Sequence, residues 1–534
     1  MRNSGALRRE VQLTNPIIES PPRGYGEPNP VIVGIETSLT TLHRYDFPNR
    51  SESTEDRATW EQTVRNNLAW IDAAKYDVLR IGVGDAATSL ATEATEWDWL
   101  IEPTRAESRV RLFCTTPAFA EVETVKNTLQ ALPWKGVIAG ESKQDDLNEL
   151  LDACAENGIA LYSGFSSYYG PKNEFMVGLA NKQSSQQGNH WLDARAVSSA
   201  APGAVRNLLF LLTLQFKPNG VFTHLSTQEH AYAWIMNTNT QDVRNWYTYL
   251  RGRAGERPIA NIMFDANYLP VDSALAHYQR HFLATLNSGL GLAGYDIQLT
   301  KGVPIDDADL HIIVSEDGAM SDIAKSIVSA GNPVLWLPVR GIGSNGQTAP
   351  ITEAFGLSTG LLAADTGPLN PQSDIDGFTV KLQTENSQDR YPSHIPLSSD
   401  AVNGEILAAS DGIPIVIRKD SNAVFNGVAL HPEAAFIIAQ SAATITNRAT
   451  TLQAPFNGYG VAGTRSAFLA TGPTELRVRL HHDDGTPFEN GTRIRAIRFS
   501  AYGNPRGREV FEYVAPFTKV LTEHELIIIE AMPS

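Results

Sequence analysis

The chain has 534 residues, of which 42% are hydrophobic and 19% are charged, and its formal net charge is -16. This length is too great for one hydrophobic core and predicts about three domains, with a composition typical of a folded globular protein. The negative charge argues against nucleic-acid and anionic-membrane partners and suits a neutral substrate.

The two cysteines, Cys114 and Cys154, have no metal-ligand spacing. They indicate free thiols in a reducing compartment, with a single disulfide as the alternative. The N-terminal stretch has no apolar signal-peptide core, and no later apolar run reaches the length of a membrane span. We therefore expect a cytoplasmic protein that begins with an irregular leader over residues 1–28.

Residues 29–257 alternate apolar strands with helical segments, which is typical of a parallel α/β domain. Helices are predicted at Thr59–Lys75 and Pro202–Phe216, the second with proline in its first turn. The predicted strands are Val31–Ile35, Val78–Val83, Arg109–Cys114, the apolar core of Trp134–Ser142, Ile159–Phe165, Phe175–Ala180 and Gly220–Leu225.

These seven strands are one fewer than an eight-stranded barrel needs in order to close. The polar loop Gln183–His190 or the segment Trp191–Ala194 is expected to hide the missing strand. The fold class is therefore α/β, with a reduced or distorted TIM-like barrel as its first domain.

Residues 258–445 are predicted to form a doubly wound α/β domain followed by a β-rich return segment. In this domain the loop Gly341–Gly346 lacks phosphate-binding spacing, so no nucleotide site is expected there. Residues 446–534 contain β-prone runs that indicate an antiparallel sandwich. The elements predicted in these two regions are the strands Ile259–Phe264, Asp309–Val314, Pro333–Pro338, Ile406–Ala409, Ile413–Arg418, Val424–Leu430, Glu475–Leu480, Arg493–Ser500 and Glu525–Glu530, and the helices Asp272–Asn287, Met320–Ala330 and Glu433–Ala443.

Four stretches together resemble glycoside hydrolase family 42, the β-galactosidases: Tyr76–Pro117, Ala201–Phe222, Asp306–Arg340 and Asn403–Leu430. All four are architectural stretches and none is a catalytic motif. The resemblance implies a barrel, an amidotransferase-like trimerisation domain and a small β-sandwich. It also implies a carbohydrate substrate, a homotrimer and no cofactor.

Glu141 is the first catalytic candidate because it follows a buried strand, where side chains of a parallel barrel face the active-site mouth. In the family, a glutamate at this place is the general acid/base and follows an asparagine, whereas Gly140 precedes it here. Retaining glycosidases need a second carboxylate about 5 Å away, and inverting enzymes hold it farther off.

The second carboxylate has several candidates. The family spacing puts the nucleophile near Gln183, and an amide cannot serve as that nucleophile. Glu229 is slightly favoured because it lies just beyond the last strand, Asp193 is an alternative, and Glu174 is expected at the wrong end of its strand.

Further polar residues are expected at the same mouth. Glu36 and Asp85 follow predicted strands, and Arg80 lies in one; each could bind sugar hydroxyls or fix a neighbouring carboxylate. Aromatic rings that could stack on a sugar are Trp97, Tyr162, Tyr168, Tyr169, Trp191 and Trp234.

Other chemistries have weaker support. His224, with Glu229 and His230, matches no metal-binding spacing, so no metal is expected and His224 is kept as a substrate contact. No nucleophile elbow of a serine hydrolase occurs at a strand-to-helix turn. The sequence favours a divergent glycoside hydrolase, with a non-catalytic relative used for carbohydrate binding or assembly as the alternative.

Overall fold

The computed structural model covers the whole chain, and the description below is confined to part of it. The residues that the structure describes are 11–12, 32–38, 45–46, 51–52, 56–73, 76–82, 111–115, 136–139, 160–166, 190–194, 202–217, 220–224, 240–252, 257–264, 273–315, 320–337, 354–357, 360–361, 372–382, 397–398, 403–425, 431–482, 486–501 and 508–532.

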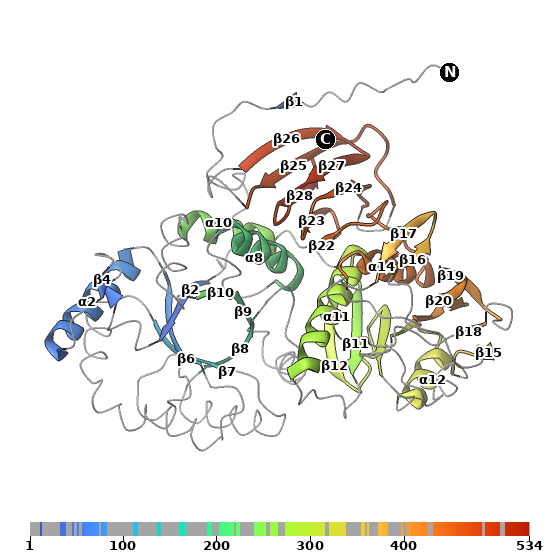
Figure 1. Cartoon of the computed structure of the whole chain (residues 1–534), viewed down its shortest axis with the longest axis horizontal. Helices are drawn as coiled ribbons and strands as arrows, with labels where there is room; N and C mark the ends of the chain where they lie inside the picture. The colour runs from blue at the N-terminus through green and yellow to red at the C-terminus, as the bar shows by residue number, and fades with distance from the viewer. Residues whose placement is uncertain are drawn as a thin grey trace.

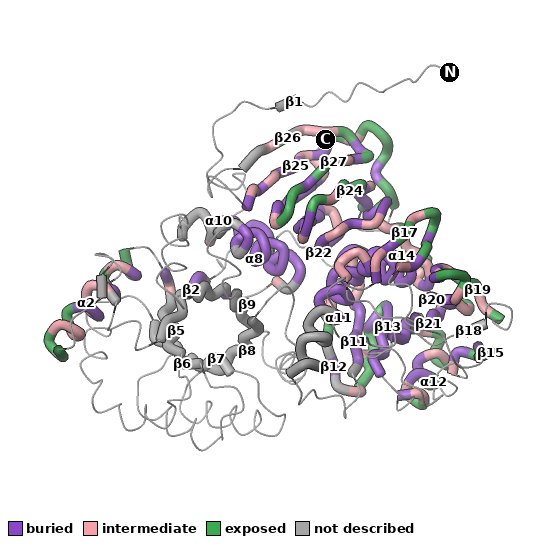
Figure 2. Tube along the Cα trace, viewed as in Figure 1, coloured by how far each residue is buried: buried purple, intermediate pink, exposed green. Residues whose placement is uncertain are grey.

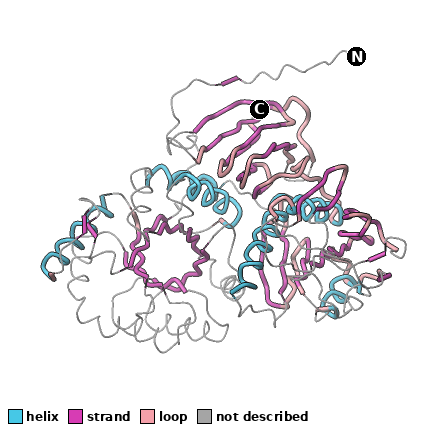
Figure 3. The backbone as a smooth tube through the Cα atoms, in the orientation of Figure 1, coloured by secondary structure: helices cyan, strands magenta, loops and turns pink. Residues whose placement is uncertain are grey.

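A closed barrel of seven parallel strands forms the N-terminal part of the chain (Figures 1 and 3). Each strand pairs with the next along the chain, and β10 pairs with β2 to close the ring. The strands are β2 (Ile32–Ser38), β5 (Val78–Gly82), β6 (Arg111–Thr115), β7 (Gly136–Ala139), β8 (Ala160–Ser166), β9 (His190–Ala194) and β10 (Gly220–His224).

The barrel differs from the sequence prediction in its sixth strand. β9 (His190–Ala194) contains Trp191–Ala194, one of the two segments expected to hide a missing strand, whereas the predicted strand Phe175–Ala180 lies outside the described residues. β9 pairs with β8 on one side and β10 on the other, so the described strands close the ring without an eighth. Closure satisfies the backbone groups that an open sheet edge would leave unpaired.

The barrel helices that the structure describes are α2 (Arg57–Ala73), α8 (Pro202–Phe216) and α10 (Thr240–Gly252). α2 begins two residues before the predicted Thr59, because the Asp56 carboxylate accepts hydrogen bonds from the Thr59 backbone N–H at 2.9 Å and from its hydroxyl. α8 keeps the predicted bounds and is buried over most of its length (Figure 2). A helix that is apolar all round has to be covered on both sides.

The middle part of the chain forms a nine-stranded sheet with a parallel and an antiparallel half. The parallel strands are β12 (Asp296–Lys301), β11 (Ile259–Phe264), β13 (Leu310–Val314), β14 (Val334–Leu337) and β21 (Asn422–Phe425), in that spatial order. The antiparallel strands that follow are β20 (Ile413–Lys419), β19 (Glu405–Ser410), β16 (Gln372–Ile375) and β17 (Phe378–Lys381).

Helices pack on this nine-stranded sheet. α12 (Ser321–Ser329) buries Ala324 and Ile327 with Ile313 and Trp336 in one hydrophobic cluster. The longer helices α11 (Ser273–Leu292) and α14 (Ala434–Ile445) belong to the main core cluster. Two of the antiparallel hairpins, β16–β17 and β19–β20, turn at Asp376-Gly377 and Asp411-Gly412, where all four residues have positive φ, as tight two-residue turns require. The Gly341–Gly346 loop lies outside the described residues.

The imidazole of His311 on β13 is enclosed by this sheet. It is 1% exposed, and neither ring nitrogen has a hydrogen-bond partner within the part of the chain described here. Burial lowers the pKa of His311, because the charged imidazolium would lose its hydration. The pKa of His481 in the C-terminal region is also lowered, first by burial and then by Arg479 and His482.

We expect stability to fall as the pH drops below about 6.5, the ordinary histidine pKa. Both folded-state pKa values lie below the unfolded ones, so the unfolded chain binds more protons in this window and is favoured there. Thermal midpoints at pH 7.5, 6.5 and 5.5 measure the effect. His311→Leu should reduce the dependence of the thermal midpoint on pH and leave the midpoint at pH 7.5 unchanged. If the pH dependence of this variant equals that of the wild type, His311 is not its source.

The C-terminal part of the chain contains a six-stranded sheet and a separate two-stranded sheet. The six-stranded sheet has the spatial order β1-β26-β25-β28-β23-β22, and its strands are β1 (Val11–Gln12), β26 (Arg508–Val514), β25 (Arg493–Phe499), β28 (Leu526–Ala531), β23 (Arg465–Ala470) and β22 (Gly458–Val461). The two-stranded sheet pairs β24 (Thr474–Val478) with β27 (Phe517–Leu521). β1 belongs to the predicted irregular leader, which therefore contributes an edge strand beside β26.

Close contacts join the middle sheet's helices to the C-terminal region. A Cβ at Gly291 of α11 would lie 2.8 Å from the Gly460 carbonyl oxygen of β22, and one at Gly460 would lie 2.4 Å from Leu292. Lys217, just after α8, forms an ion pair with Asp296 of β12 at 2.6 Å. The barrel, the middle sheet and the C-terminal sheets therefore meet at one junction (Figure 1). None of the helices among the described residues is long and apolar enough to cross a membrane.

Candidate functional site: the inner face of the barrel

Three polar residues lie in one register row near the carboxyl ends of neighbouring barrel strands. Glu36 of β2 is the register partner of Arg80 on β5 and of His224 on β10. Adjacent strands are about 4.8 Å apart, so the three positions are direct neighbours on one face of the sheet. Glu36 lies inside β2 and not beyond it as expected, because Thr37 and Ser38 continue the pairing with β5.

Asp193 shares this face through the pairing of β9, β10 and β2. Asp193 is the register partner of Phe222, and Phe222 is that of Gly34, which lies two residues before Glu36. Residues two apart in a strand lie on the same face. Asp193, Glu36 and His224 are therefore positions of one surface.

The two aromatic candidates share the same face. Trp191 lies two residues before Asp193 and pairs with Gly164 of β8, and Tyr162 lies two residues before Gly164. All six predicted site residues that the described strands contain thus lie on one face of the barrel sheet. They are Glu36, Arg80, Tyr162, Trp191, Asp193 and His224.

The opposite face of the same strands is mostly apolar and packs against a helix, which identifies it as the outer one. Val33 on β2 is 2% exposed and belongs to a core cluster with Val64 and Leu68 of α2. Helices cover the outside of a parallel barrel, so the face of Val33 is the outer face and that of Glu36 the inner face. Most of the further outer positions are also apolar, among them Ile35, Leu79, Ile81, Leu112, Val137, Leu161, Leu192 and Val221, while Thr37, Ser163, His190 and Thr223 are the polar ones.

An ion pair at the amino end of the barrel holds β2 in place. The Asp77 carboxylate accepts a hydrogen bond from the Val33 backbone N–H at 3.0 Å and one from Arg244 of α10 at 2.9 Å. The Asp77 N–H in turn donates to the Val33 carbonyl oxygen. These bonds fix the start of β2 against β5 and α10, and with it the register of Glu36.

The other predicted site residues, Glu141, Asp85, Gln183 and Glu229, lie outside the described residues. In the chain, Glu141 comes two positions after Ala139, the last residue of β7. Glu229 comes five positions after His224. The described residues contain no group of three or more histidine, cysteine, aspartate or glutamate side chains that could hold a metal ion.

The sequence names Trp191–Ala194 as one of two segments that could hide a missing strand, with Asp193 as an alternative second carboxylate. The structure places the Asp193 backbone in β9, at an inner-face position. The available signal was the alternation in His190–Ala194, in which Leu192 and Ala194 occupy outer positions and Trp191 and Asp193 inner ones. Two of its five residues, His190 and Asp193, are polar, so its apolar periodicity is too weak to distinguish it from the neighbouring segment Gln183–His190.

No protein-family model matches the sequence, and no curated protein is similar to it. Among solved structures, α-L-fucosidase isoenzyme 2 from Paenibacillus thiaminolyticus is similar over 94% of this chain and 100% of its own, at 10% identity and a TM-score of 0.49. An N-acetylneuraminic acid synthetase from Leptospira borgpetersenii serovar Hardjo-bovis is similar over 51% of this chain and 96% of its own (13% identity, TM-score 0.26).

A dihydropteroate synthase from Xanthomonas albilineans is similar over 43% of this chain and 85% of its own (14% identity, TM-score 0.25). A glycoside hydrolase is thus among the similar structures, and family 42 in particular is not identified. At these identities and TM-scores the likenesses do not define this chain's activity.

Proposed function

We propose that the chain is a divergent glycoside hydrolase, related in plan to family 42, that acts on an oligosaccharide or glycoside at the carboxyl end of the barrel. The observation that carries the proposal is the common inner face of Glu36, Arg80, Asp193 and His224 in a closed parallel barrel. Carboxylates and hydrogen-bond donors converging at this end of a barrel are what glycoside hydrolysis requires.

Glu141 is the proposed general acid, which protonates the leaving-group oxygen. Asp193 is the proposed second carboxylate, and we now prefer it to Glu229. β9 is separated from β7 by β8 alone, so a carboxylate on β9 is near the end of the strand that leads to Glu141. Depending on their separation, Asp193 would attack the sugar directly or activate a water.

The remaining inner-face residues are proposed to bind the sugar. Arg80 and His224 would hold Glu36 as a hydrogen-bond acceptor for a hydroxyl group, since the three are register neighbours. Trp191 and Tyr162 would offer rings to the apolar face of the sugar. Gln183 and Asp85 are retained as hydrogen-bonding residues of the same mouth.

Leaving-group dependence tests these roles. On nitrophenyl glycosides with a good leaving group, Glu141→Gln should keep turnover, whereas on alkyl glycosides it should lose at least about 100-fold in rate. Asp193→Asn should lose turnover on both substrates. Glu475→Gln, a change on an exposed strand of the C-terminal region, is the control that should leave both rates unchanged. Wild-type rates in both variants would exclude these two residues from the mechanism.

The alternative function is carbohydrate binding or assembly without catalysis. It is favoured by Gly140, which stands where the family has asparagine, and by Gln183, which stands near the expected nucleophile. Calorimetric binding of oligosaccharides, with no release of reducing sugar on long incubation, would support this alternative over the hydrolase.

A homotrimer belongs to the same proposal, as do the absence of a cofactor and of nucleic-acid or membrane partners. Light scattering at several protein concentrations measures the oligomeric state. A monomer at all concentrations would contradict the trimer and leave the proposed hydrolysis open to its own test.

A further inference from the structure

The helices on either side of β10 carry buried side chains that bind the C-terminal six-stranded sheet. α8 precedes β10 in the chain, α10 follows it, and both lie between the barrel and this sheet (Figure 1). α8 approaches β22, β23 and β28 of the sheet. β10 carries His224 on the inner face, so the two helices connect that face with the C-terminal region.

Asn207 joins α8 to two turns of the C-terminal region. Its side chain is fully buried, and its amide nitrogen donates to the carbonyl oxygens of Phe499 at 3.0 Å and His524 at 2.8 Å. Its amide oxygen accepts from the Arg206 guanidinium, which also donates to the Ser500 carbonyl oxygen. An amide with all of these bonds made fits only one placement of the helix on the sheet.

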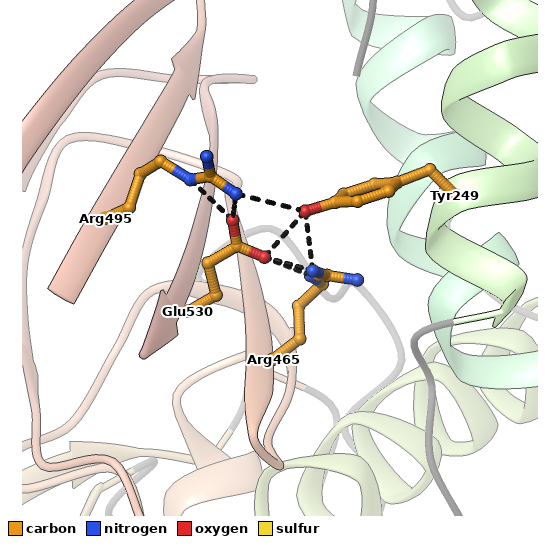
Figure 4. A network of polar contacts seen from close by, with 4 residues as sticks. All are labelled: Tyr249, Arg465, Arg495 and Glu530. Atoms are coloured by element: carbon orange, nitrogen blue, oxygen red, sulfur yellow. Dashed lines mark hydrogen bonds and ion pairs between the residues drawn. The ribbon is translucent and has the colours of Figure 1, made fainter. Parts of the chain in front are cut away.

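Tyr249 joins α10 to the same sheet through a buried charged cluster (Figure 4). Its hydroxyl donates to the Glu530 carboxylate at 2.7 Å and accepts from Arg465 at 2.6 Å. Arg465 and Arg495 both pair with the Glu530 carboxylate, and the Arg465 guanidinium stacks over the Tyr249 ring at 4.0 Å. Burial lowers the pKa of Arg465 to about 10, so it stays charged at neutral pH.

In this cluster two arginines share the Glu530 carboxylate, so the Tyr249 hydroxyl is needed as a further hydrogen-bond acceptor. Arg465 is 6% exposed, and its second terminal nitrogen has no hydrogen-bond partner in the described part of the chain. Removing the hydroxyl would take away another acceptor from a buried guanidinium, which is costly in a low-dielectric site. The hydroxyl also orients the carboxylate that both arginines share.

Aromatic rings fill the space between the two polar contacts. Phe499 at the end of β25 packs edge-on against Trp246 of α10, with ring centroids 5.2 Å apart, and against Phe210 of α8 at 5.3 Å. Trp246 also packs edge-on against Tyr249. The interface between the two helices and the C-terminal sheet therefore has an apolar centre flanked by specific hydrogen bonds and ion pairs. This arrangement is typical of interfaces that stay associated.

We propose that the C-terminal sheet is a fixed outer layer of the barrel, and that Tyr249 and Asn207 are positioning residues that set the place of α10, α8 and so of β10. This differs from a separately mobile binding module on a linker, which would have a smaller and more polar contact. The inference goes beyond the proposed function and does not depend on hydrolysis.

Tyr249→Phe in the full chain tests the proposal, with Tyr247→Phe as matched control. Tyr247 lies in the same helix and is equally buried, but its hydroxyl has no hydrogen-bond partner among the residues described. In Tyr249→Phe, amide hydrogen exchange in α10 and β10 should rise at least about tenfold, because hydrogen bonds to charged groups are lost. The sheet β11–β14 should exchange as in the wild type, and Tyr247→Phe should match the wild type throughout.

His224, which occupies an inner-face position of β10, gives a second readout. In carbon-13 histidine spectra, its signal is assigned by its loss in His224→Gln among the 12 histidines of the chain. The signal should shift or broaden in Tyr249→Phe and in Asn207→Leu, and stay in place in Tyr247→Phe. If exchange and the His224 signal are the same in all three variants as in the wild type, the C-terminal sheet does not position β10 and the proposal is overturned.

Discussion

Replacing Glu530 with glutamine is expected to lower the free energy of unfolding by about 3–5 kcal/mol. The side chains of Arg465 and Glu530 are each 6% exposed, and Arg495 is 26% exposed. Without the carboxylate, the buried Arg465 guanidinium would lose its ion-pair partner and face the half-buried Arg495, so its lost hydration and the repulsion between the two cations would no longer be compensated. Urea unfolding followed by circular dichroism measures the change.

Two controls define the origin of this effect. Glu475→Gln breaks an ion pair with Arg477 whose side chains are 44% and 51% exposed, and should cost less than about 1 kcal/mol. The triple variant Arg465→Met/Arg495→Met/Glu530→Leu removes all three charges and should recover most of the loss, since apolar groups of similar size tolerate burial. Equal losses in Glu530→Gln and Glu475→Gln would contradict the buried-charge explanation.

Replacing Gly458 with alanine is expected to destabilise the C-terminal region by about 1–3 kcal/mol or more. A Cβ at this position would lie 2.2 Å from the Leu469 carbonyl oxygen and 2.6 Å from the Phe456 ring. Leu469 is the neighbouring strand's backbone, paired one residue along with Tyr459, so β22 and β23 would have to separate locally. The methyl group cannot be accommodated by a side-chain rotation alone.

Gly463 provides the matched control for this substitution. It lies in the turn that joins β22 to β23, and a Cβ there would lie 3.5 Å from the nearest atom, which is an ordinary contact. Gly463→Ala should therefore leave the thermal midpoint within experimental error, while Gly458→Ala lowers it by several degrees. A midpoint in Gly458→Ala equal to that of Gly463→Ala would show that β22 relaxes more easily than its packing implies.

For the inner face of the barrel, local sequence patterns predict the candidate residues but not which of them are neighbours. Glu36 and Arg80 were candidates from sequence because each lies in or beside an apolar run. The adjacency of Glu36 and Arg80 depends on the register of β2 with β5, and that of Glu36 and His224 on the register of β10 with β2, which joins the two ends of the barrel domain. No periodicity within either strand encodes that register, because it is decided by how the ring of strands closes.

The amino-acid sequence by itself determined the local elements and their class. Proline at the start of α8 with its apolar run, and Asp-Gly at the hairpin turns, specify conformation within a few residues. The alternation of strands and helices likewise indicated the parallel α/β class, because each element must bury an apolar face against the next.

Only the tertiary structure decided that the barrel closes with β9, that the leader adds β1 to the C-terminal sheet, and that Tyr249 meets Glu530. Each of these depends on a pairing partner elsewhere in the chain, and the local sequence does not specify which partner that is. A tyrosine in an amphipathic helix has the same pattern whether its hydroxyl faces water or a buried carboxylate. Tyr249 meets Glu530 because the packing of α10 against the C-terminal sheet removes water from Arg465 and Glu530. The Tyr249 hydroxyl then makes the hydrogen bonds that water would otherwise make to these two side chains.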